Sequence, residues 1–133
     1  MADPAALIQQ IQRVLSPDLL LPRWRGNACS LAGHCYSASE ALFHLVGGRS
    51  AGAKPCSARC PGGVHWWITL GEERLDPTAE QFDPKTLEAI YSQGVGRGFL
   101  TKQPSRRALE IMRRVNLGLS GAADSRPKVS GVR

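Results

Sequence analysis

The sequence predicts an α+β domain, and two patterns carry that prediction. Apolar residues recur at helical spacing in three segments: 4–15, 35–46 and 103–115. Apolar and polar residues alternate from Val64 to Leu70, which is typical of a strand, and Gly71 begins a turn into a second arm at 74–76. We therefore expect helices packed on an antiparallel hairpin.

The composition is that of a globular chain with one core. The chain has 133 residues, of which 42% are apolar and 21% are charged. We expect a single domain over residues 1–117 and a disordered basic tail over 118–133, where Ser, Gly, Ala and Pro dominate. Part of the net charge of +6 lies in this tail.

Four arginines in the last helical segment account for most of the remaining positive charge: Arg106, Arg107, Arg113 and Arg114. We expect them on the solvated face of an amphipathic helix. No nucleic-acid-binding motif accompanies them, so we do not expect a nucleic-acid partner. The sequence leaves the oligomeric state open.

The first fifteen residues lack the basic start and unbroken apolar stretch of a signal peptide. No apolar run approaches the length that spans a membrane. We expect a cytoplasmic protein without a membrane partner, in which the four cysteines stay reduced and form no disulfide.

The first helix is predicted to follow Asp3, which can cap it, with Pro4 at the first helical position. Its apolar stripe consists of Leu7, Ile8, Ile11, Val14 and Leu15. Pro17 and Pro22 then predict an irregular segment.

The central helix is predicted to begin at Cys35, after Gly33, and to end at the pair Gly47-Gly48. A thiol at a helix N-terminus lies at the positive end of the macrodipole, close to unpaired N–H groups. We therefore expect the pKa of Cys35 to be lowered. The alternative is that Cys35 is a small buried apolar residue.

The segments around the predicted strand are less regular. Residues 49–54 predict a connector, and 55–63 a poor strand or a loop. In the strand, one face carries Val64, Trp66, Ile68 and Leu70, and the other carries His65, Trp67 and Thr69. By this alternation Trp66 is a core residue and Trp67 is a candidate wall of a cleft beside His65.

Two further helices are predicted downstream. Residues 84–90 predict a short helix capped by Asp83, and 94–98 predict a loop. The final helix begins around Gln103-Pro104-Ser105, and its buried stripe comprises Ala108, Ile111, Met112 and Val115.

Cys35, His65 and Asp76 are the candidate catalytic residues. A cysteine nucleophile needs a base that removes its proton and later protonates the leaving group. That base in turn needs a group that fixes its tautomer. We expect the Cys35 sulfur to lie near one nitrogen of the His65 ring and Asp76 near the other.

The hairpin supplies a geometric condition for this triad. A loop of even length places His65 and Asp76 on the same face of the hairpin. A two-residue loop at 70–71 makes them directly opposite, and a four-residue loop at 70–73 makes them diagonal. A loop of three or five residues puts them on opposite faces and excludes the triad.

Several motifs of the chain resemble the papain-like and transglutaminase-like cysteine superfamily: Gly33-His34-Cys35-Tyr36, His65-Trp66-Trp67 and Leu75-Asp76-Pro77-Thr78-Ala79. More narrowly, residues 24–115 resemble small phage and bacterial proteins that share a GHCY, HWW, LDPTA and GRGFLT pattern. The resemblance implies a cysteine on a helix that packs on an antiparallel sheet carrying His and Asp.

The resemblance implies no particular substrate. From the candidate triad we expect hydrolysis or acyl transfer at an amide, peptide or isopeptide carbonyl through a Cys35 thioester. We expect a protein or peptide substrate, no cofactor and no metal. The superfamily often has a Gln before the cysteine as oxyanion donor, but Cys29 and Ser30 stand in that region here. Asn27 and His34 are the alternative candidates for this role.

Two other functions remain open from the sequence. The first is a zinc module, with Cys56, Cys60 and His65 as ligands and Cys29 or Cys35 as the fourth. The second is a non-catalytic binding protein, which would use either the basic helix at 106–114 or, as a papain-like scaffold, the same groove to bind peptide without chemistry.

Overall fold

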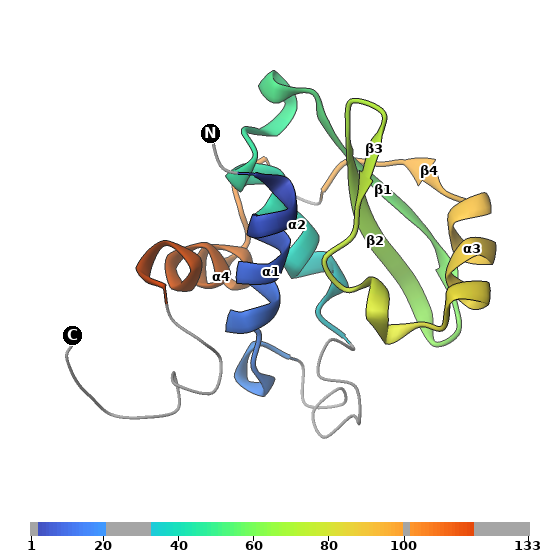
Figure 1. Cartoon of the computed structure of the whole chain (residues 1–133), viewed down its shortest axis with the longest axis horizontal. Coiled ribbons are helices and arrows are strands. Elements are labelled where there is room, and N and C mark those ends of the chain that lie inside the picture. Colours follow the sequence, from blue (N-terminus) through green and yellow to red (C-terminus); the bar gives the residue numbers. More distant parts are fainter. Residues whose placement is uncertain (1–2, 21–32, 100–101, 119–133) are drawn as a thin grey trace.

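The computed structural model describes residues 3–20, 33–99 and 102–118, and shows an α+β fold (Figure 1). Its helices are α1 (Pro4–Val14), α2 (Cys35–Leu45), α3 (Pro84–Ser92) and α4 (Arg106–Leu117). Its strands are β1 (Ala53–Cys60), β2 (Gly63–Leu70), β3 (Glu73–Leu75) and β4 (Val95–Gly96). Short 3-10 helices are η1 (Pro17–Leu19), η3 (Gly48–Ala51) and η4 (Ala79–Gln81).

The four strands form one antiparallel sheet in the order β3-β2-β1-β4. β1 and β2 pair along their whole length, from Ala53 opposite Leu70 to Cys60 opposite Gly63. The prediction of a poor strand or loop over 55–63 is therefore wrong for most of that segment. Its small and polar residues show little β-propensity, and pairing with the strongly patterned β2 decides its conformation.

The two faces of the sheet bury different clusters. The larger core joins α1, α2 and α4 to one face, where Ile68 of β2 is fully buried. On the other face Trp67 packs with Ala58 and with Ile90 of α3. Figure 1 shows α3 on the side of the sheet away from α1, α2 and α4. Adjacent residues of β2 therefore point into two separate cores.

Local capping explains where the helices begin. Asp3 accepts a hydrogen bond from the Ala6 N–H at the start of α1, as predicted. Asp83 accepts from the Thr86 N–H at the start of α3, which is also as predicted. At the end of α2, Gly47 has a φ of 112°, a conformation that favours glycine.

The last helix differs from its prediction in one residue. Arg114 is only 2% exposed, not part of a solvated face. Its guanidinium donates to the Val14 carbonyl, to Ser16 Oγ and to the carboxylates of Asp18 and Glu110. The arginine is buried because α4 packs on α1 at this point and these acceptors surround it.

Gly118 caps α4 with a φ of 71°, and residues 119–133 of the predicted tail lie outside the described residues. Within the part of the chain that the structure describes, none of the helices has the length and apolar character needed to cross a membrane.

Candidate active site

The hairpin of β2 and β3 brings His65 and Asp76 to one face. Leu70 pairs with Glu73, which leaves the two-residue loop 71–72. Extending that register past β3 places Asp76 diagonal to His65. Of the two predicted arrangements, the diagonal one on the same face is confirmed, although the loop is 71–72 and not 70–73. The directly opposite arrangement with a loop at 70–71 does not form.

The side chains of His65 and Asp76 are buried and lie within hydrogen-bonding distance of each other. His65 Nε2 lies 2.6 Å from an Asp76 carboxylate oxygen, and the two side chains are 0% and 4% exposed. The Asp76 carboxylate also accepts hydrogen bonds from the Thr78 N–H at 3.1 Å and from the Tyr91 hydroxyl at 2.6 Å. Three donors thus hold the carboxylate, and the carboxylate orients the imidazole.

The second nitrogen of the His65 ring has no such partner. Nδ1 is buried and has no hydrogen-bond partner among the described residues. A buried polar atom without a partner costs free energy, and such atoms in native proteins call for an explanation. Because Asp76 occupies Nε2, Nδ1 is the nitrogen that remains available for a reacting group.

Cys35 lies against the main chain on both sides of His65. Its thiol donates to the Val64 carbonyl, with a sulfur–oxygen distance of 3.5 Å, and the Trp66 main chain also hydrogen-bonds to it. One turn further along α2, Ser39 Oγ donates to the Trp66 carbonyl at 3.0 Å. The start of α2 therefore lies along β2 at His65, beyond the point where pairing with β3 ends.

The thiol and the imidazole are not hydrogen-bonded to each other in this structure, since Nδ1 has no partner. Both nevertheless line one cavity of about 250 Å³, together with Tyr36, Cys60 and Gln81. The structure thus brings Cys35 and His65 to one cavity and holds His65 by Asp76, without a hydrogen bond between the sulfur and the imidazole.

Burial raises the pKa of Cys35 to about 11. Hydrogen bonds from the Trp66 and Tyr36 main chain act in the opposite direction, but the loss of solvent outweighs them. The predicted lowering of this pKa is therefore wrong. The hydrogen bond from the Tyr36 main chain at the helix start lowers the pKa of Cys35, as expected. Burial of the thiol has the larger effect and reverses the sign of the shift, and the helix pattern does not reveal that burial.

The candidates for the cleft and the oxyanion donor lie elsewhere. Trp67 is 3% exposed in the core under α3, and its neighbour Trp66 lines the cavity instead. His34 is 2% exposed and does not belong to the cavity lining among the described residues; burial lowers its pKa to about 4. Asn27 lies outside the described residues.

Two residues of the site were missed by sequence reasoning. Tyr91 reaches Asp76 from α3, and its phenol ring also packs edge-on against Trp67. Gln81 enters the cavity from η4, where its amide Nε2 donates to Thr78 Oγ1 at 3.1 Å. The segment 77–82 after the hairpin showed no periodicity that could have revealed this amide.

The described residues contain no group of three His, Cys, Asp or Glu side chains that could hold a metal ion. The zinc set of Cys56, Cys60 and His65 is thus not assembled there, and Cys29 lies outside the described residues. Comparison with known proteins adds no assignment, since no family model, curated protein or solved structure matches the chain.

Proposed function

We propose that the protein is a cysteine-dependent hydrolase or acyltransferase with a papain-like or transglutaminase-like active site. One observation carries the proposal: Asp76 holds His65 through Nε2, Nδ1 of His65 is buried without a partner among the described residues, and His65 lines the same cavity as Cys35. This chemistry requires a cysteine near a base that a third group orients, and Cys35, His65 and Asp76 supply these three groups.

The first half of the reaction forms a thioester. His65 Nδ1 accepts the proton of the Cys35 thiol, and the thiolate sulfur attacks the carbonyl carbon of the substrate. The resulting imidazolium is stabilised by Asp76 at the opposite nitrogen. Nδ1–H then donates its proton to the leaving nitrogen, the carbon–nitrogen bond breaks, and the amine departs.

The second half releases the acyl group. Water or an acceptor amine attacks the thioester carbonyl while His65 Nδ1 removes its proton. The carbon–sulfur bond breaks, and the Cys35 sulfur regains the proton from Nδ1. Hydrolysis and acyl transfer therefore differ only in the nucleophile of this step.

The raised pKa of Cys35 favours proton transfer during the reaction over a preformed thiolate. In the free protein the Cys35 thiol is neutral at pH 7, and it is not hydrogen-bonded to Nδ1 of His65. Substrate that enters the cavity excludes water and moves the sulfur toward the imidazole. General-base assistance of this kind contributes about 10²- to 10⁴-fold to a rate.

Two donors are available for the oxyanion of the tetrahedral intermediate. The first is the Cys35 N–H at the start of α2, one of the four N–H groups that have no partner within the helix. The second is the Gln81 amide, which reaches the same cavity. Gln81 would thus replace the glutamine that precedes the cysteine in the superfamily.

Acyl-donor labelling tests the proposal. The full-length protein is incubated with a panel of activated peptide esters and amides, and the modified cysteine is identified by mass spectrometry. We expect one acyl group on Cys35 and none in Cys35→Ala. Donors that carry glutamine, isopeptide or cell-wall peptide groups then separate deamidase, transglutaminase, protease and amidase activities.

Cys60 provides the matched control, because it lines the same cavity without lying at the helix start. Cys60→Ala should leave the acylation of Cys35 unchanged. Equal acylation of Cys35 and Cys60, or no acylation by any donor, would show a groove that binds without chemistry.

A further inference from the structure

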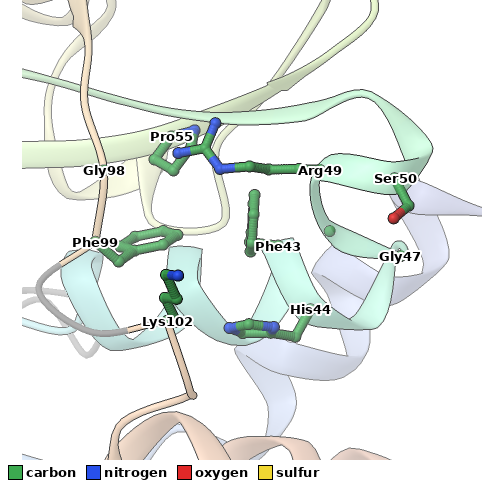
Figure 2. Close-up of a pocket in the computed structure, with 10 residues that line it drawn as sticks. Phe43, His44, Gly47, Arg49, Ser50, Pro55, Gly98, Phe99 and Lys102 are labelled. Atoms are coloured by element: carbon green, nitrogen blue, oxygen red, sulfur yellow. The ribbon is translucent and has the colours of Figure 1, made fainter.

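A second and larger pocket lies at the C-terminal end of α2. It has a volume of about 490 Å³, and Phe43 and Phe99 supply its apolar surface (Figure 2). Glycines 47, 48 and 98 also line it. The volume falls in the range of small-molecule and side-chain binding sites.

Positively charged and basic side chains surround this apolar surface. Arg49 and Lys102 are exposed at its rim, and His44 lies beside them, as Figure 2 shows. No carboxylate lines the pocket, and among the described residues no acid pairs with Arg49 or Lys102. Two cationic side chains without an acidic partner, next to apolar rings, favour a ligand with an anionic group attached to an apolar moiety or to a peptide main chain.

A row of aromatic rings connects this pocket with the Cys35 cavity. Phe99 stacks on Trp66 with 5.6 Å between ring centroids and meets Tyr36 at 5.4 Å. On its other side Phe99 meets Phe43 at 5.3 Å. Trp66 and Tyr36 line the Cys35 cavity, whereas Phe99 and Phe43 line the basic pocket, so the two sites share a wall.

We infer that the basic pocket binds an acidic side chain of the peptide that reacts at Cys35. The statement that this peptide is the substrate rests on the proposed function. The statement that the pocket binds an acidic side chain does not. The rings that separate the two sites are only two centroid steps deep, 5.6 and 5.3 Å, and an extended peptide advances about 3.3 Å per residue. One short peptide therefore reaches both sites, and the substrate carries Asp or Glu within a few residues of the acyl group.

Equilibrium binding to Cys35→Ala tests the pocket without requiring any chemistry. Fluorescent six-residue peptides carry Glu at successive positions, and matched peptides carry Gln there. We expect the best Glu peptide to bind about tenfold or more tightly than its Gln counterpart, and added salt to reduce the difference. Arg49→Glu and Lys102→Glu should each abolish the preference for Glu.

Lys85→Glu is the matched control, because it makes the same charge change on an exposed residue of α3, on the other side of the sheet. It should leave the preference intact. Arg49→Gln, a milder change at an exposed position, guards against an effect of charge reversal on folding, and should weaken the preference severalfold.

The outcomes separate the two proposals. Equal binding of Glu and Gln peptides, or an equal loss in Lys85→Glu, overturns the inference even where Cys35 is acylated. Tighter binding of a mononucleotide than of any Glu peptide, with the same dependence on Arg49, overturns the assignment to a peptide. Glu-selective binding that needs Arg49 supports the inference, and a lack of acylation then contradicts only the proposed function.

Discussion

Two buried polar clusters in different parts of the fold differ in how completely they are satisfied. Around Arg114, at the contact of α4 with α1, the guanidinium donates to four acceptors, two of them carboxylates. Around Asp76, at the end of the hairpin, three donors hold the carboxylate, but Nδ1 of His65 has no partner among the described residues.

The difference indicates different roles for two clusters of similar burial. A charge that makes four hydrogen bonds within the fold, two of them to carboxylates, stabilises one packing arrangement and has little left to offer a ligand. A nitrogen that is held in place by its neighbour, yet lacks a partner of its own, is ready to take or give a proton. Burial alone would not distinguish them; the count of partners does.

The largest expected effect is on the unsatisfied cluster. His65→Gln keeps an amide in the hairpin but removes the proton-transfer group, and should slow acylation of Cys35 by about 10²- to 10⁴-fold. Single-turnover acylation, measured by mass spectrometry against the wild type, gives this ratio. An unchanged rate would mean that His65 is as structural as Arg114.

The satisfied cluster should respond in stability and not in chemistry. Arg114→Met leaves the Val14 carbonyl and Ser16 without their donor and should lower the free energy of unfolding by about 3 kcal/mol, at the low end for a broken buried ion pair because Asp18 stays hydrated. Urea unfolding measures the loss.

Arg113 offers a control on the same helix. Its side chain is 51% exposed and pairs with Glu110, so Arg113→Met should cost less than about 1 kcal/mol. At permissive temperature both variants should acylate Cys35 at the wild-type rate. Slower acylation in a fully folded Arg114→Met protein would show that the two clusters are coupled.

The reactivity of the thiol sharpens the comparison further. Since burial raises the pKa of Cys35 from 9.0 to about 11, its thiolate fraction at pH 7 should be about a hundredfold smaller than that of an ordinary thiol. Iodoacetamide labelling of Cys35 should accordingly be slow at neutral pH and rise only as the pH approaches 11.

His65→Gln should leave this labelling profile nearly unchanged, because no hydrogen bond joins the thiol to the ring in the free protein. Fast wild-type labelling at mildly acidic pH, lost in His65→Gln, would instead reveal a preformed thiolate–imidazolium pair. The readout is the modified fraction of Cys35 in tryptic peptides across a pH series.

Within the Asp76 cluster, a smaller effect than that of His65→Gln is expected at Tyr91. Tyr91→Phe removes one of the three donors to the Asp76 carboxylate and should cost about 1.5 kcal/mol of stability, the low end for a hydrogen bond to a charged group, since Tyr91 is half-buried. Acylation should fall by no more than about tenfold, because Asp76 still contacts His65. A loss as large as that of His65→Gln would make the phenol part of the proton path.

Local sequence patterns determined the elements that need only near neighbours. The caps at Asp3 and Asp83 depend on a side chain and an N–H three residues apart, and both form as predicted. The alternation in 64–70 likewise places His65 and Trp67 on the face opposite Ile68, because side chains of a strand alternate by geometry alone.

Tertiary structure decided what depends on residues far apart in the chain. β1 forms because β2 offers it a partner, and Arg114 is buried because its acceptors arrive from around residue 16, about 100 positions earlier. The sign of the Cys35 pKa shift follows the same rule. The helix start is local and lowers the pKa, whereas desolvation comes from chain packed around the thiol, and only the assembled fold determines how much water remains there.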